Sequence, residues 1–125
     1  EHKRKMKNNA TQKDKQDDII KRCYDDGSIE INDRSYKICK VNHKKRLKIF
    51  GYASKIKDKL LSRDLSFLGS DEQLAVEELM FSNITFNDSR LAGIDNHFEK
   101  YGEDYIPLFT TSLSVFSYPF MRGSR

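Results

Sequence analysis

The chain has 125 residues and a mass of 14.7 kDa, which suits one small domain with a tail and excludes a large multi-lobed enzyme. Hydrophobic residues make up 37% of it, charged residues 34%, and the mean hydropathy is -0.76, so we expect a soluble chain with a modest core. Two cysteines, Cys23 and Cys39, are too few for a disulfide framework and are expected to be reduced thiols. No apolar leader with a cleavage site opens the chain, which predicts an intracellular protein.

Charge is distributed unevenly along the chain. Residues 1–60 carry 18 Lys+Arg against 9 Asp+Glu, a net of +9, whereas residues 61–125 carry 5 against 10, a net of -5. This asymmetry is typical of a nucleic-acid-binding arm, or of complementary surfaces through which copies of a chain dock head to tail. The alternative is that the two halves pair within one folded domain. In the head-to-tail case the acidic side chains of a second copy would be Glu72, Glu77, Glu78, Glu99, Glu103 and Asp104.

The first 18 residues are basic and amide-rich, and Met6 is their only large apolar side chain, so we expect residues 1–18 to form a disordered basic arm. A short helix is predicted from Asp17 to Tyr24. The single globular domain is expected over residues 19–121. Residues 122–125 (RGSR) are interpreted as the remnant of a cloning vector.

A period-two pattern starts at Ser28 and predicts a β-hairpin that turns between Ile31 and Arg34. Asn32 and Asp33 suit this turn because their side chains tolerate a left-handed backbone. The alternation places four apolar side chains on one face of the hairpin: Ile29, Ile31, Tyr36 and Ile38.

A long amphipathic helix is predicted from His43 to about Leu61, capped by Asn42. Its apolar row is Ile49, Ala53, Ile56 and Leu60. Four lysines fall on the opposite side of the helix: Lys44, Lys48, Lys55 and Lys59. Arg46 and Lys57 lie within the apolar arc and are expected to extend their stems past the core.

The second half predicts further helices. Ser70 and Gln73 form a capping box that predicts a helix over residues 71–82. Residues 83–95 are rich in turn formers and predict a loop with one helical turn near Ser89, and residues 96–101 predict a short helix. A final helix is expected to run to about Ser117, where Pro119 stops it. Residues 105–121 carry no charge but are too polar and too interrupted to cross a membrane, so this helix is expected in the core. The predicted fold class is therefore α+β, mainly α, with a short N-terminal β-hairpin followed by about four helices.

No catalytic or metal-binding pattern is present. His2, His43 and His97 lie far apart and none has a second strong ligand at helical spacing, so no metal site is expected. His97 is expected to be an ordinary surface histidine at the start of a polar helix. Nucleotide-binding and hydrolase motifs are also missing, so we expect no cofactor and no enzymatic activity.

Three segments in order, "IEINDRSYKI", "NHKKRLKIFGYASKI" and "EDYIPLFTTSLSVFSYPF", resemble the small tail assembly chaperones of long-tailed bacteriophages over residues 28–121. The basic arm departs from that family's pattern. The resemblance implies a non-catalytic protein of the host cytoplasm that acts in virion morphogenesis. It implies that such a protein binds the long helical tape measure protein, recruits tail tube subunits and associates with itself.

Two groups of residues are candidates for binding. The protein-interface candidates are aromatic, with burial in the core as the alternative: Phe109, Phe116, Tyr118 and Phe120. The second group is a basic patch: Lys44, Lys45, Lys48, Lys55 and Lys59. This patch also suits the phosphates of nucleic acid, with Tyr36 and Tyr52 near it in the sequence, so the alternative function is a small basic nucleic-acid-binding protein. A merely solvated helix face is the plainer interpretation of the lysines.

Overall fold

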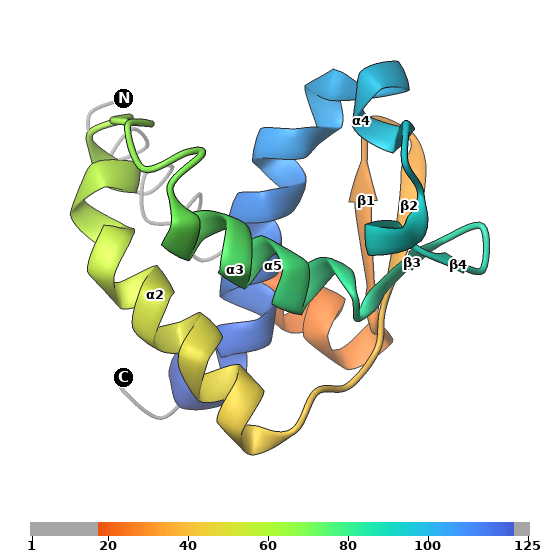
Figure 1. Cartoon of the computed structure of the whole chain (residues 1–125). Coiled ribbons are helices and arrows are strands. Elements are labelled where there is room, and N and C mark those ends of the chain that lie inside the picture. The colour runs from red at the N-terminus through yellow and green to blue at the C-terminus, as the bar shows by residue number, and fades with distance from the viewer. Residues whose placement is uncertain (1–17, 122–125) are drawn as a thin grey trace, which may run out of the picture.

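The computed structural model describes residues 18–121 (Figure 1). Residues 18–26 are helical. The later elements are β1 (Ser28–Ile31), β2 (Arg34–Ile38), α2 (His43–Leu61), α3 (Asp71–Phe81), β3 (Ile84–Phe86), β4 (Ser89–Arg90), a 3-10 turn (Leu91–Gly93), α4 (His97–Lys100), a 3-10 turn (Gly102–Asp104) and α5 (Tyr105–Met121). The predicted mainly helical α+β class is confirmed, including four helices after the first hairpin. The predicted arm and the terminal RGSR lie outside the described residues, apart from Asp18, which begins the described helix.

The strands form one antiparallel sheet in the order β1-β2-β3-β4. The predicted hairpin is confirmed: Ile29 pairs with Tyr36, Ile31 pairs with Arg34, and both of the turn residues between the strands have positive φ angles. A left-handed backbone at both central positions matches the twist of the flanking strands, so the Asn-Asp dipeptide sets the register of this hairpin.

The prediction of a loop over residues 83–95 is wrong. β3 and β4 form a second hairpin there, and its turn residues Asn87 and Asp88 again have positive φ angles, of 51° and 67°. The helical turn lies at Leu91–Gly93 and not near Ser89. Strands of three and two residues are too short to show an alternating pattern, and β3 is held by pairing with β2, which a local pattern does not contain.

The capping predictions hold for both long internal helices. The Asn42 side chain accepts a hydrogen bond from the Lys45 backbone N–H at 2.9 Å, and the Ser70 hydroxyl accepts one from the Gln73 backbone N–H at 3.2 Å. Each cap satisfies one of the backbone donors that a helix leaves free at its N-terminus. α2 has the predicted bounds, and α3 ends one residue before the predicted end.

α5 continues past the predicted stop. Pro119 lies inside the helix, which ends at Met121. Proline removes one backbone hydrogen bond from a helix, but the last turn is held from outside. The Phe120 ring packs on the Phe50 ring, with 5.1 Å between centroids, and on the His43 ring at 5.6 Å. Packing of Phe120 on α2 therefore offsets the backbone hydrogen bond that α5 loses at Pro119.

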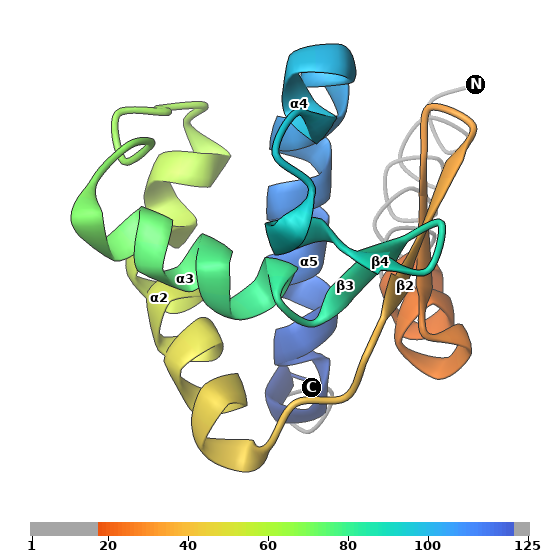
Figure 2. The ribbon, with the colours of Figure 1, turned by 45° about the vertical axis from the view of Figure 1, so that its right-hand side comes forward.

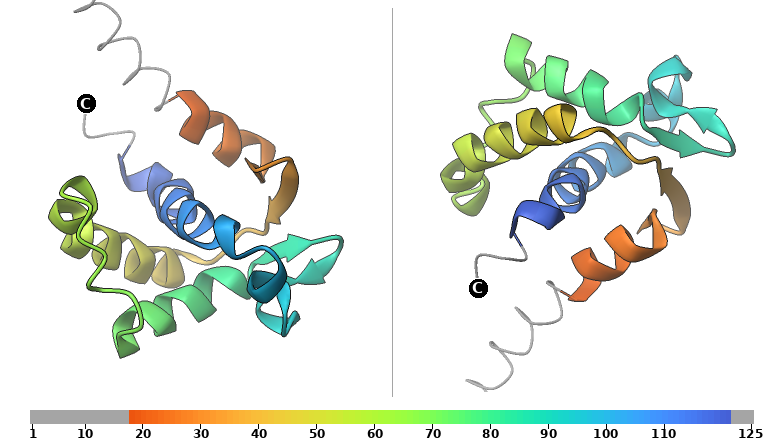
Figure 3. Two further views of the ribbon diagram at one scale, coloured as in Figure 1. Left: turned by 90° about the horizontal axis from the view of Figure 1, so that it is seen from above. Right: turned by 90° about the horizontal axis from the view of Figure 1, so that it is seen from below.

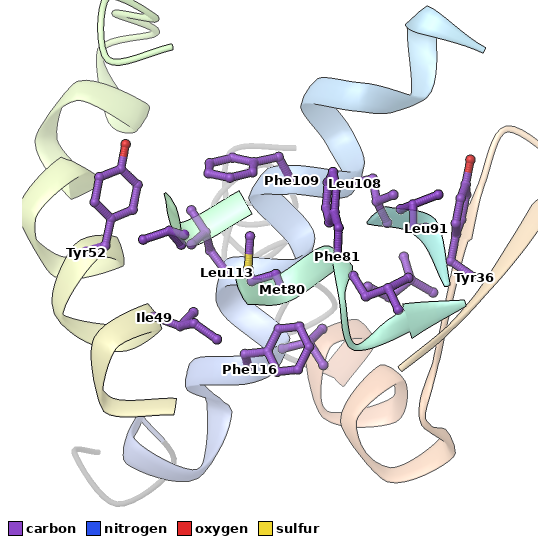
Figure 4. Close-up of a cluster of buried hydrophobic side chains, with 14 of the residues drawn as sticks. Tyr36, Ile49, Tyr52, Met80, Phe81, Leu91, Leu108, Phe109, Leu113 and Phe116 are labelled. Atoms are coloured by element: carbon purple, nitrogen blue, oxygen red, sulfur yellow. The ribbon is translucent and has the colours of Figure 1, made fainter. Parts of the chain in front are cut away.

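α5 is the central element of the molecule, with α2 on one side and the sheet on the other (Figure 2). Its side chains fill the space between these layers, as Figure 4 shows for Phe109, Leu113 and Phe116, which are each about 1% exposed. Ile49 of α2 and Tyr36 of β2 close the core from opposite sides.

Gly51 lies in the interior of α2 and is exposed, and a β-carbon added there would have no heavy atom within 4 Å. We predict that Gly51→Ala raises the free energy of unfolding by about 1 kcal/mol, because alanine has the higher helix propensity. Urea unfolding followed by circular dichroism measures this change. Gly27→Ala is the matched control: Gly27 has φ of +69°, so alanine is strained there and the protein should lose stability.

Candidate functional site

The structure separates the four aromatic candidates into two pairs. Phe109 and Phe116 lie in the core of this chain, and for them the core alternative replaces the interface prediction. Their burial follows from the central position of α5, which is covered from two sides. Tyr118 and Phe120 remain partly exposed, Tyr118 against the Tyr24 ring at 5.2 Å. Only these two can still contribute to an interface.

The lysines of the basic patch all lie on α2 with exposed side chains: Lys44, Lys45, Lys48, Lys55 and Lys59. Lys55 pairs with Glu72 of α3, at 3.0 Å between the ammonium and the carboxylate. Among the described residues, the other four have no carboxylate within ion-pair distance. The patch is therefore available to an acidic or phosphate-bearing partner.

A groove of about 400 Å³ runs between α2 and α5. Aliphatic and aromatic side chains form most of its walls, and small hydroxyl side chains of α5 form its floor. Its lining residues are Phe50, Ala53, Ser54, Lys57, Leu60, Leu61, Thr110, Leu113, Ser114, Ser117, Phe120 and Met121. We call it the α2/α5 groove. Leu61 is 74% exposed and belongs to this apolar lining, and contiguous exposed apolar surface marks interaction sites.

A second hollow continues the α2/α5 groove across α5. It is lined by Ile20 of the N-terminal helix and shares Leu60, Thr110 and Ser114 with the groove. Seen from below, α5 lies between α2 and the helix of residues 18–26 (Figure 3). The hydroxyl-bearing face of α5 thus forms the base of a depression with a helix on either side.

The floor of the groove holds an unused polar group. The Ser117 side chain is 1% exposed, and its hydroxyl has no hydrogen-bond partner among the described residues. A buried polar group without a partner lowers stability. Lys57 is the one charged residue among those that line the groove, and it makes the apolar surface favour a negatively charged partner.

A second cluster, not foreseen from the sequence, lies between the first hairpin and the start of α5. The prediction of a surface His97 is wrong: this side chain is 4% exposed. Asp104 is fully buried, so it cannot be an acidic contact for a second copy. Its carboxylate accepts hydrogen bonds from Asn32, from Tyr36 at 2.6 Å and twice from Arg34, at 2.5 and 2.8 Å.

The hydrogen bonds fix the proton positions in this cluster. The Tyr36 hydroxyl has one proton and donates it to Asp104, so His97 Nε2, 2.8 Å from the hydroxyl oxygen, must donate to Tyr36. The Arg34 guanidinium holds the pKa of Asp104 well below its usual range, with smaller contributions from Tyr36 and Asn32. Burial lowers the pKa of His97, so the ring stays neutral.

This cluster connects parts of the fold. Every donor to Asp104 comes from the first hairpin or its turn, and Asp104 directly precedes α5. The Arg34 guanidinium also lies over the Tyr101 ring, at 4.1 Å from its centroid, and donates to Glu103. A carboxylate bound on all sides has no free lone pair for a substrate, so we assign the cluster to holding the sheet on α5.

Two other kinds of site are absent from the described part of the chain. Within residues 18–121 no group of three or more histidine, cysteine or acidic side chains is placed to hold a metal ion. Within the same residues, no helix has both the length and the apolarity that a membrane crossing requires. The α2/α5 groove is the candidate site because it combines a volume of about 400 Å³ with a mostly apolar lining.

We predict that the free energy of unfolding decreases in two stages as the pH is lowered from 8 to 3. The lowered pKa of His97 makes the unfolded chain bind a proton first, below about pH 6.5, and Asp104 adds a second loss below about pH 4. Asp104→Asn should cost about 2 kcal/mol at pH 7, because the Arg34 side chain loses its charged partner, and it should remove the second stage. Urea unfolding between pH 3 and pH 8 tests both points. An unchanged acid stage in this variant would contradict the assignment to Asp104.

Comparison of the chain with protein-family models, with curated proteins and with solved structures finds no match.

Proposed function

We propose that this protein is a non-catalytic docking module that binds an amphipathic helix of another protein in the α2/α5 groove. The observation that carries the proposal is the apolar lining of this groove, which includes Phe50 of α2 and Phe120 of α5. The exposed lysines of α2 lie on the same helix. Helices are recognised in this way by laying an apolar face into a hydrophobic groove.

The charges around the groove select the partner. Lys57 lines it, and none of the described residues in that lining is acidic. A partner helix with acidic residues beside its apolar face would therefore bind faster and more specifically than a basic one.

In its specific form, we propose that the protein is a tail assembly chaperone of a long-tailed bacteriophage, acting in the host cytoplasm. The resemblance of three segments supports this proposal, and so does a groove suited to the helices of a tape measure protein. In this function the bound helix belongs to the tape measure protein, and the docked complex recruits tail tube subunits. The chemistry needed is burial of apolar surface, without a cofactor.

A small nucleic-acid-binding protein is the second candidate. The observation in its favour is a row of exposed α2 lysines with no carboxylate within ion-pair distance among the described residues: Lys44, Lys48 and Lys59. Phosphate contacts of this kind require no groove. The two functions differ in their response to salt, because phosphate binding weakens steeply as counterions compete, whereas apolar docking does not.

The groove is tested with a labelled synthetic helix of about 18 residues that carries leucines on one face and glutamates beside them. Fluorescence anisotropy should show binding to the wild type, and Leu61→Gln should weaken it about tenfold by removing apolar contact. Leu65→Gln is the matched control, since Leu65 is 43% exposed and lies outside the groove lining. Equal binding by wild type and both variants, or none by the wild type, would contradict the proposal.

The second candidate is tested by anisotropy of labelled random-sequence duplex and single strands at about 50 mM and about 200 mM salt. We expect little binding at the lower salt. Micromolar affinity that collapses at the higher salt, and that Lys44→Glu with Lys48→Glu abolishes, would make nucleic-acid binding the preferred function.

A further inference from the structure

The side of α2 that faces away from α5 has an unusual composition. It presents Lys44, Leu47, Lys48 and Gly51 in successive helical turns, and all four are exposed. We call these residues the outer α2 face. Leu47 is 44% exposed, and the basic side of the helix continues beyond Gly51 to Lys55, which pairs with Glu72 of the same chain, and to Lys59. The face thus combines an apolar centre with a basic border.

Gly51 is not explained by the fold. It lies well inside α2, where glycine costs about 1 kcal/mol relative to alanine. No positive φ angle requires it, and a β-carbon there would meet nothing within 4 Å. The glycine therefore leaves a notch beside Leu47 that no part of the described chain fills. Notches of this kind let a second helix approach closely.

The same molecule presents a face of complementary character on α3. Asp71, Leu74, Ala75 and Glu78 are exposed and recur at helical spacing, opposite the buried Val76 and Met80. We call the first four the outer α3 face. Leu74 is 46% exposed and Ala75 is small, so the face has an apolar centre, and here the border is acidic.

We propose that the outer α2 face binds the outer α3 face of a second copy of this chain. Leu74 and Ala75 of one copy would cover Leu47 and fill the notch at Gly51 of the next. Charge complementarity selects this occupant, because the acidic border of α3 meets the basic border of α2. The charged members of the two faces are Lys44 and Lys48 on α2 and Asp71 and Glu78 on α3. None of them forms an ion pair with another described residue.

The contact is heterologous, since it joins two different faces. When one such contact forms, one copy keeps its outer α3 face free and the other keeps its outer α2 face free for further contacts. Such contacts generate rings when the rotation closes and open arrays when it does not. The inference does not rest on the α2/α5 groove, whose α2 lining residues are a different set.

The test uses the full chain and two variants that block one face each. Gly51→Gln fills the notch with a good helix former, and Leu74→Glu places a charge at the centre of the α3 face. Sedimentation from about 10 μM to about 1 mM should show a mass that rises with concentration for the wild type and stays monomeric for each variant. The wild-type mass should fall as salt is added.

Mixing the two variants decides the geometry. Gly51→Gln keeps its α3 face and Leu74→Glu keeps its α2 face, so an equimolar mixture should form one-to-one dimers and nothing larger. Glu99→Lys, an exposed charge change on α4, is the control and should associate like the wild type. A monomeric wild type at about 1 mM, association of either variant alone, or a mixture that stays monomeric would overturn the proposal. Peptide binding in the groove is measured separately and is unaffected by these outcomes.

Discussion

The carboxylate of Asp104 is the interaction on which the arrangement of the molecule depends. It lies at the start of α5, and Asn32, Arg34 and Tyr36 of the first hairpin all donate to it. A buried carboxylate is stable only when its charge is compensated, so the hairpin cannot leave α5 without a large loss of free energy. Because this pins the sheet to one side of α5, the opposite side is left for α2.

Packing of α2 on α5 then determines which surfaces remain. The apolar row of α2 takes the inner position with Ile49 and Ile56, and Tyr52 beside them. The two helices do not close against each other along their whole length, and the α2/α5 groove is the space between them. Because the apolar row of α2 faces inward, its lysines face the solvent.

The proposals for the groove and for the outer faces share one physical pattern. In each, exposed leucine is bordered by charge of one sign, Leu61 near Lys57 in the groove and Leu47 between lysines on the outer α2 face. Apolar contact supplies most of the binding free energy in such surfaces, and the charged border selects the partner and its orientation. A single small domain can thus hold a partner helix and a second copy of itself at separate places.

The positions of α2 and α3 and the turn of the first hairpin were determined by the sequence alone. Caps at Asn42 and Ser70, the apolar row of α2 and the Asn-Asp turn are local signals, and each was confirmed, because neighbouring residues suffice to produce them. The basic side of α2 followed from the same spacing. The lysines themselves carry no signal that tells a docking surface from a solvated one.

Only the tertiary structure decided which apolar side chains are buried in the core and which stay at the surface. Phe116 and Phe120 are chemically alike and four residues apart in one helix, yet the first lies in the core and the second at the groove. β3 exists because β2 lies beside it, and His97 is buried because Tyr36 and Phe86 pack on its ring. These outcomes depend on contacts between residues far apart in sequence, and no local pattern encodes such contacts.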